Sequence, residues 1–381
     1  MQATRRIPKT LTLLALCLVA TFARADSSPA RLASLLEPIR ATNNLPALAA
    51  VVVQGGHTVA IGAVGFRKHG SPEPVTVRDK FHIGSCTKSM TAVLAAMLVE
   101  EGKLAWTNTL ADAFPELAPE MKPAWRTVTV EQLLTHRGGA PAKLDANGLW
   151  SRLWDRASLP GREQRAYLTR ELLVKQEPVA VPDGKYIYAN AGFALVGHII
   201  ETKLNQSWED ALRQRLFRPL KMTSAGFGAP ANEDQVDQPW GHTRGMFSGL
   251  KPVAPGPGAD NPAAIGPGGT VHCSLADLAA YCNFQLGHKY GATNLLRPET
   301  LQKLHSGKEG DYARGWILLD RRWGGRVLMH NGTNTSFYTV IWLAPEKDFA
   351  LVVCTNLGGD IAASAADAAA WAIIQKYLVQ P

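Results

Sequence analysis

Ser85 and Lys88 are the two residues whose types and spacing best fit a chemical reaction. They stand just before residues 90–99, an apolar segment with a helical pattern. Residues three apart on a helix share a face, so the Lys88 amine can reach the Ser85 hydroxyl. A serine attacks a carbonyl once a neighbouring base takes its proton, and the free N–H groups of a first helical turn can hold an oxyanion. This segment therefore predicts a nucleophile, a proton acceptor and part of an oxyanion hole.

Further polar residues are candidates to complete such a site. Tyr188 and Asn190 follow a turn-prone Pro-Asp-Gly and lead into an apolar helical segment. His330 ends a strand-like segment and is followed by Gly332 and Thr333. The end of a strand is where a polar residue that lines a cleft is commonly presented.

Similar patterns elsewhere in the chain lack this context. Residues 248–251 repeat the Ser-x-x-Lys spacing in a Gly/Pro-rich stretch with no helical pattern behind it, so we interpret this copy as accidental. Tyr281 begins a second Tyr-x-Asn in the middle of a predicted helix, where packing is expected. His-x-Gly also occurs at His136 and His305, but neither ends a strand.

The N-terminus has the form of a secretory signal. Three basic residues precede the apolar segment 11–22, which is too short for a stable anchor, and small residues occupy positions 23 and 25. We predict a signal peptide at 1–25, cleavage after Ala25, and a periplasmic or secreted protein with no stable membrane anchor. An uncleaved N-terminal anchor is the alternative.

Composition excludes several classes of protein. The net charge of +8 falls to about +4 without the signal. The sequence contains no basic tract interleaved with aromatic residues, so we do not expect nucleic-acid binding. The ten histidines show no metal-ligand spacing, so we expect no metal and no cofactor. Four cysteines are too few for a disulfide-built scaffold, although one bridge is possible. These are Cys86, Cys273, Cys282 and Cys354.

The order of predicted elements indicates an α/β (α+β) fold. A helix at 29–41 precedes a hairpin, a long helical middle follows, and three strands and an alanine-rich helix close the chain. Short connections between consecutive strands favour an antiparallel sheet covered by helices. Residues 243–267 are interpreted as a surface loop. The five predicted strands are 48–53, 59–64, 326–330, 337–343 and 349–355.

Taken together, these motifs resemble the class C β-lactamase and D-Ala-D-Ala carboxypeptidase superfamily of penicillin-recognising serine hydrolases. The resemblance rests on the ordered sets at 85–88, 188–190 and 330–332, and it extends over about 30–378. It implies a five-stranded antiparallel sheet flanked by helices, with an inserted helical subdomain. We therefore expect one catalytic domain at 26–381. Its α/β part would comprise about 30–90 and 265–381, and its helical subdomain about 91–264.

The resemblance also implies roles for the candidate residues. Ser85 would become acylated, Lys88 and Tyr188 would share the proton transfers, and which of the two is the base stays open. A Lys88 ammonium nearby would favour the phenolate of Tyr188. Asn190 would bind the amide side of the substrate. The backbone N–H groups of Ser85 and Thr333 would form the oxyanion hole, with Gly332 beside them.

His330 departs from the pattern of the class C β-lactamases. Their similar motif has lysine at this position. Histidine is only partly charged near neutral pH, so its hold on a substrate carboxylate is weaker. We expect an exported serine hydrolase that acts through an acyl-enzyme on D-amino-acid peptides, small amides or esters. A true class C-like β-lactamase and a non-catalytic penicillin- or muropeptide-binding sensor are the alternatives. The oligomeric state stays open.

Overall fold

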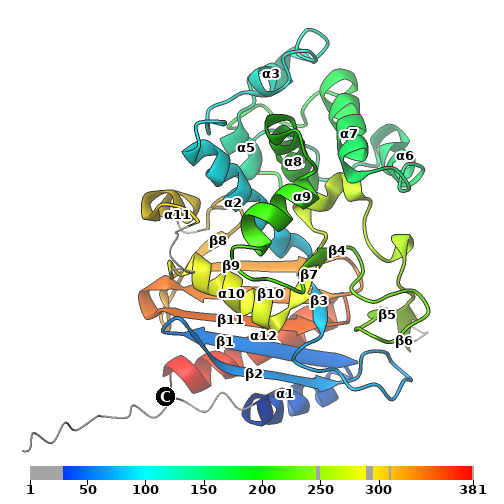
Figure 1. The fold of residues 1–381 in the computed structure, drawn as a ribbon, viewed down its shortest axis with the longest axis vertical. Coiled ribbons are helices and arrows are strands. Elements are labelled where there is room, and N and C mark those ends of the chain that lie inside the picture. Colours follow the sequence, from blue (N-terminus) through cyan, green and yellow to red (C-terminus); the bar gives the residue numbers. More distant parts are fainter. Residues whose placement is uncertain (1–28, 246–248, 289–294, 309, 380–381) are drawn as a thin grey trace, which may run out of the picture.

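A six-stranded antiparallel sheet is the centre of the fold (Figure 1). The computed structural model describes residues 29–245, 249–288, 295–308 and 310–379, so the predicted signal peptide lies outside the described residues. The strand order is β2-β1-β11-β10-β9-β8. The strands are β1 (Ala47–Gln54), β2 (His57–Gly65), β8 (Ile317–Arg321), β9 (Gly325–Thr333), β10 (Tyr338–Ala344) and β11 (Phe349–Thr355).

The predicted hairpin and the three C-terminal strands are confirmed, but the expected number of five strands is wrong. The sixth strand, β8, pairs with β9 through a tight turn, from Ile317 opposite Met329 to Arg321 opposite Gly325. Its sequence has only three apolar residues before Asp320 and Arg321. A segment this short carries little periodicity, and the hairpin with β9 determines its conformation.

Both faces of the sheet are buried. Along β1, the side chains of Leu48, Ala50 and Val52 belong to one apolar cluster and the alternate residues to another. One face packs against α1 (Pro29–Thr42) and α12 (Asp360–Ile374), and the other against α10 (Leu275–Gln285). A strand that is buried on both faces has a continuous apolar sequence, and this pattern predicts β1.

The helical middle of the chain gathers at one end of the molecule, above the sheet (Figure 1). The apolar helix α2 (Thr87–Glu100) connects the two parts and is buried from Thr87 to Leu98. A capping box formed by Thr129 and Gln132 starts the short helix at Val130–Leu134. The other helices are α3 (Leu110–Ala113), α4 (Pro123–Arg126), α5 (Val130–Leu134), α6 (Leu149–Trp154), α7 (Gly161–Lys175), α8 (Asn190–Leu204), α9 (Trp208–Leu212) and α11 (Pro298–Leu304).

The segment interpreted as a surface loop, 243–267, contains more structure than expected. It includes most of a two-stranded sheet and ends in a 3-10 helix, η5 (Ala263–Gly268). The two strands carry few apolar residues, so their pairing left no hydrophobic pattern in the sequence. The remaining strands are β3 (Lys80–His82), β4 (Gly226–Phe227), β5 (Gly241–Gly245), β6 (Gly249–Val253) and β7 (Val271–Ser274).

Candidate active site

Ser85 lies in a single 3-10 turn, Gly84–Cys86, between β3 and α2. Its side chain is partly exposed, whereas Gly84 and Cys86 are buried. Gly84 has φ +49, and a Cβ atom there would lie 2.3 Å from the backbone nitrogen of Thr333. Only glycine fits this close approach, and it brings the start of α2 against the end of β9.

Lys88 is fully buried, and its Nζ contacts three oxygen atoms. It lies 2.9 Å from Ser85 Oγ, 2.6 Å from Asn190 Oδ1 and 2.6 Å from the carbonyl of Gly268. Burial lowers the pKa of Lys88 to about 7, because the charged form loses its hydration. A neutral amine has two hydrogens for Asn190 and Gly268 and a lone pair for Ser85. This geometry lets Lys88 take the Ser85 proton.

Tyr188 hydrogen-bonds Ser85 through its hydroxyl, and its ring centre lies 4.7 Å from Lys88 Nζ. The expectation of a favoured phenolate is wrong. Burial raises the pKa of Tyr188 far above its usual range, and this effect exceeds the lowering by the Ser85 hydrogen bond. Tyr188 is therefore protonated at neutral pH, so it is suited to act as a proton donor and not as the initial general base.

The backbone at the end of β9 touches the Ser85 turn. A Cβ atom at Gly332 would lie 2.0 Å from the carbonyl oxygen of Ile83 and 2.6 Å from the backbone nitrogen of Ser85. Together with the approach of Gly84 to Thr333, this contact places the two predicted oxyanion-hole segments side by side. The arrangement needs glycine at position 332 because any side chain would collide with backbone atoms.

His330 is buried, with 2% of its surface exposed. Its Nδ1 lies 2.5 Å from the carbonyl oxygen of Asn331, so Nδ1 carries the proton and Nε2 accepts from the Tyr312 hydroxyl at 2.9 Å. Burial, with a contribution from Lys88, lowers the pKa of His330 to about 3. The protonation of His330, which the sequence leaves open, is therefore that of a neutral imidazole at neutral pH.

His136 belongs to the site although its motif lacked the expected context. Its Nδ1 accepts the backbone N–H of Ala189 at 3.2 Å, and its carbonyl accepts that of Ile187 at 2.9 Å. Its ring centre lies 4.5 Å from that of Tyr188 and 4.4 Å from that of Tyr312. Burial lowers the pKa of His136 to about 2. His136 thus fixes the segment that carries Tyr188 and Asn190.

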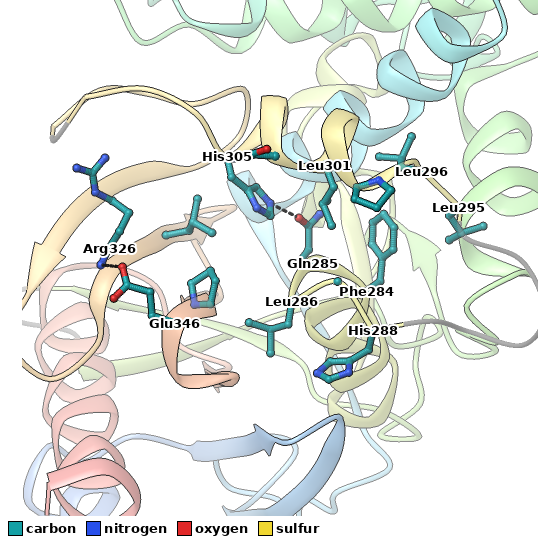
Figure 2. A pocket seen from close by; sticks show the side chains of 15 residues that line it. Phe284, Gln285, Leu286, His288, Leu295, Leu296, Leu301, His305, Arg326 and Glu346 are labelled. Carbon is teal, nitrogen blue, oxygen red and sulfur yellow. Dashed lines mark hydrogen bonds between the residues drawn. The ribbon is translucent and has the colours of Figure 1, made fainter.

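A chain of hydrogen bonds holds the Ser85 turn from the side of α10. Ser89 Oγ donates to the carbonyl of Cys86 at 2.8 Å and accepts the hydroxyl of Tyr281 at 2.8 Å. Gln285 donates to Tyr281 at 2.7 Å. Its Oε1 accepts from His305 at 2.7 Å, and Figure 2 shows this second bond. Tyr281 is fully buried, so the packing role predicted for it holds, and its hydroxyl adds the hydrogen bond to Ser89.

An apolar cavity of about 500 Å3 lies at the far end of this chain, between α10 and α11 (Figure 2). Gln285 and His305 belong to its walls, whereas none of the predicted site residues lines it. The cavity is therefore separate from the surroundings of Ser85.

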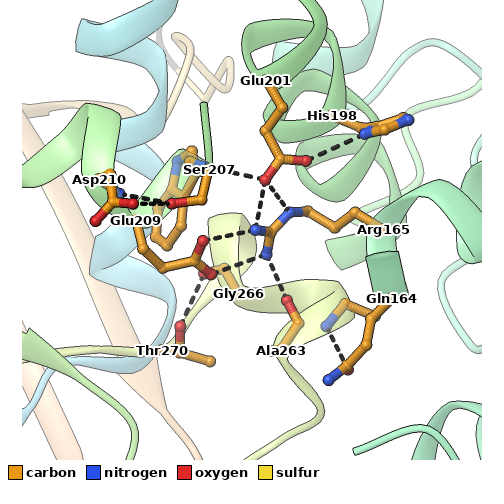
Figure 3. A network of polar contacts seen from close by, with 12 residues as sticks. Gln164, Arg165, His198, Glu201, Ser207, Glu209, Asp210, Ala263, Gly266 and Thr270 are labelled. Atoms are coloured by element: carbon orange, nitrogen blue, oxygen red, sulfur yellow. Dashed lines mark hydrogen bonds and ion pairs between the residues drawn. The ribbon is translucent and has the colours of Figure 1, made fainter. Parts of the chain in front are cut away.

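A buried ion-pair network joins Arg165 to Glu201 and Glu209 (Figure 3). The Arg165 guanidinium contacts Glu201 Oε1 and Glu209 Oε2, each at 2.6 Å, and the carbonyl of Ala263 at 2.6 Å. Ala263 begins η5, whose last residue, Gly268, accepts the Lys88 hydrogen bond. Arg165 therefore ties α7, α8 and α9 to the backbone that positions the Lys88 amine.

The other sequence expectations have simple outcomes. Ser248 lies outside the described residues, so its quartet is not placed. In the described part of the chain, no cluster of three or more His, Cys, Asp or Glu side chains is arranged to hold a metal ion. Within the same ranges no helix is both long and apolar enough to cross a membrane. The four cysteines of the predicted mature chain are all free and buried.

Comparisons with known proteins agree with this fold. The family model described as Beta-lactamase matches residues 32–376. The chain is 27% identical over 343 residues to penicillin-binding protein 4 of Amycolatopsis lactamdurans, covering 84% of each protein. It spans 64% of the length of other relatives that it matches.

Two solved structures share the fold at low identity. D-alanine carboxypeptidase AmpC from Burkholderia cenocepacia has 21% identity and a TM-score of 0.72, covering 91% of this chain and 97% of that one. D-amino acid amidase from Ochrobactrum anthropi SV3 has 19% identity and a TM-score of 0.68, covering 90% and 95%. Fold and family model together define a protein of the β-lactamase type. The chain belongs to the Beta-lactamase family.

Proposed function

We propose that this protein is an exported serine hydrolase that works through an acyl-enzyme on Ser85. The observation that carries the proposal is the contact of 2.9 Å between Lys88 Nζ and Ser85 Oγ, made by a buried amine whose pKa burial lowers to about 7. A hydroxyl becomes a nucleophile when a base of matched pKa lies within hydrogen-bond reach.

In acylation, Lys88 takes the proton of Ser85 as Oγ bonds to the substrate carbonyl. The backbone N–H groups of Ser85 and Thr333 receive the developing oxyanion. Tyr188, which is protonated and hydrogen-bonds Ser85, gives its hydroxyl proton to the leaving amine or alcohol, and the proton taken up by Lys88 replaces it. Water then attacks the acyl-enzyme with the same groups acting in reverse, which releases the acid and restores Ser85.

The proposed substrates are D-amino-acid peptides, small amides and esters. The family match and the names of the relatives, a D-alanine carboxypeptidase and a D-amino acid amidase among them, support acyl transfer from such amides. The neutral, buried His330 provides no charge for the carboxylate of a β-lactam. For this reason β-lactam hydrolysis, the activity that the family name suggests, is our second candidate function.

The test is intact-mass spectrometry after incubation with benzylpenicillin, D-Ala-D-Ala peptides and p-nitrophenyl esters. We expect a covalent adduct on Ser85 and a loss of turnover by at least about 10³-fold in Ser85→Ala. Undiminished turnover in Ser85→Ala would refute the nucleophile. Rapid nitrocefin turnover would favour the β-lactamase alternative, and ligand binding without turnover on the whole panel would favour a sensor.

A further inference from the structure

A buried pair of side chains, His82 and Asp260, contacts the Ser85 turn and has no part in the proposed proton transfers. His82 is the last residue of β3 and is fully buried, and Asp260 has 8% of its surface exposed. Nε2 of His82 lies 2.8 Å from Oδ2 of Asp260. Nδ1 of the same ring accepts the backbone N–H of Gly84 at 3.1 Å. The imidazole therefore connects the Asp260 carboxylate to the residue that precedes Ser85.

The hydrogen bond to Gly84 fixes the position of the proton on this imidazole. A backbone N–H can only donate, so Nδ1 is the ring nitrogen without a proton and Nε2 carries it. The Nε2 proton is donated to Asp260. The other carboxylate oxygen, Oδ1, also faces donors, namely the backbone N–H of Asn261 at 2.8 Å and Nδ2 of Asn334 at 3.4 Å. Both oxygens of Asp260 are thus used as acceptors.

Asn334 connects Asp260 to the other proposed segment of the oxyanion hole. It follows Thr333, the last residue of β9, and it is buried. Its Oδ1 accepts the backbone N–H of Phe337 at 3.1 Å, so Nδ2 is its donor. Nδ2 lies 3.3 Å from the carbonyl oxygen of Ala259 and 3.4 Å from Oδ1 of Asp260. The carboxylate of Asp260 is therefore shared between the two segments.

We propose that Asp260 is a positioning residue that holds the two sides of the oxyanion hole at a fixed separation. It acts on the Ser85 side through His82 and on the Thr333 side through Asn334. This inference rests on the proposed function and extends it by a residue outside the reacting groups. Backbone donors stabilise an oxyanion best when they are already placed where its charge develops, and a buried network whose members are all paired keeps such groups rigid.

Asp260→Asn tests the proposal because an amide of the same size has only one acceptor oxygen. If that oxygen faces His82, the NH2 group faces the donors of Asn261 and Asn334. If the amide is turned the other way, its NH2 group meets the Nε2 proton of His82. Moving that proton to Nδ1 would transfer the conflict to the N–H of Gly84. In every arrangement one side of the oxyanion hole loses its hydrogen bond.

An ester and its thionoester measure the oxyanion hole separately from folding. Phenyl butanoate and O-phenyl butanethioate differ only in the carbonyl oxygen, which sulfur replaces, and sulfur is a weak hydrogen-bond acceptor. The measured quantity is the ratio of kcat/KM for the ester to kcat/KM for the thionoester. We expect this ratio to fall about tenfold in Asp260→Asn, because displaced N–H groups lose part of their preference for oxygen.

A second variant and a control complete the experiment. The glutamine of His82→Gln can still donate to Asp260 but offers no acceptor to Gly84, so the ratio should fall here too. Asp277 is likewise a buried carboxylate, and it accepts the backbone N–H and the hydroxyl of Ser224 at 2.9 and 2.6 Å. Asp277→Asn should therefore lower the thermal stability and leave the ratio unchanged.

The outcomes separate this inference from the proposed function. An unchanged ratio in Asp260→Asn or His82→Gln, once thermal unfolding shows that the variant is folded, overturns the positioning role. If Asp260→Asn does not fold, His82→Gln decides alone. An equal fall of the ratio in Asp277→Asn also overturns the proposal, because the ratio would then follow stability. Turnover of phenyl butanoate that is lost in Ser85→Ala supports the proposed function even where this inference fails.

Discussion

The hydroxyl of Tyr312 donates a hydrogen bond to Nε2 of His330 across 2.9 Å, and it thereby keeps the imidazole in one neutral tautomer. Both side chains are buried. His330 therefore carries no charge that could pair with a substrate carboxylate. Its neutral ring is part of the aromatic wall around Lys88. The lysine amine is consequently the group near Ser85 whose protonation changes near neutral pH.

The pH dependence of acylation should follow Lys88. Because the reaction needs the neutral amine and burial lowers the pKa of Lys88 to about 7, kcat/KM for a neutral ester should fall about tenfold per pH unit below that value. The measurement is a pH profile of p-nitrophenyl butanoate hydrolysis. A rate that stays constant from pH 8 to pH 5 would contradict Lys88 as the base.

The stability of the fold should decrease in mild acid. Burial lowers the pKa of His136 to about 2, that of His330 to about 3, and those of His242 and His272 to about 4. Their pKa in the unfolded chain is about 6.5, so the unfolded state binds more protons below that pH. The free energy of unfolding is therefore greatest above pH 6.5 and should fall steadily from there toward pH 4.

Thermal unfolding between pH 7 and pH 5 checks this dependence. In that window the surface carboxylates remain largely ionised, so the histidines dominate the proton uptake. We expect Tm to fall by several degrees, and by less in His330→Gln, which lacks one of these groups. An invariant Tm would show that the imidazoles are hydrated in solution.

Gly332→Ala should disrupt the Ser85 turn. The added methyl would lie 2.0 Å from the carbonyl oxygen of Ile83 and 2.6 Å from the backbone nitrogen of Ser85, so the backbone must move. We expect a loss of about 10²-fold or more in kcat, comparable to the removal of an oxyanion-hole donor. Gly258→Ala is the matched control, since a Cβ there meets nothing within 4 Å. Equal activity of the two variants would place the oxyanion hole elsewhere.

Tyr281→Phe should loosen the same turn from behind. The change keeps the ring but removes the hydroxyl that donates to Ser89 and accepts from Gln285. Leaving these buried groups unpaired should cost about 1–2 kcal/mol in the free energy of unfolding. If the hydroxyl also positions Ser85, the rate constant for acylation falls while KM changes little. A variant with lower stability and normal acylation would limit Tyr281 to packing.

Much of the fold could be read from local patterns. The apolar segment 48–53 is short, rich in valine and followed by a Gly-Gly turn, which favours a strand, whereas the apolar segment behind Ser85 is long enough for a helix. The spacing of Ser85 and Lys88 is a local pattern as well, because three residues along a helix bring two side chains to one face regardless of the surroundings. The edge strand β8 and the polar hairpin β5–β6 were not predicted, because their sequences contain little apolar pattern.

The protonation of the site was decided by tertiary structure. Nothing near Tyr188 in the sequence shows that burial keeps its phenol protonated, and nothing near His330 shows that Tyr312 and Asn331 hold it neutral. His136 lies far from Tyr188 and Tyr312 in the chain and meets them only after folding. Local spacing determines which groups can face each other, whereas the loss of hydration in an assembled core determines their charge. The spacing in the sequence therefore predicts that Ser85 and Lys88 face each other, and the packing around Lys88 lowers the pKa of its amine toward neutral pH.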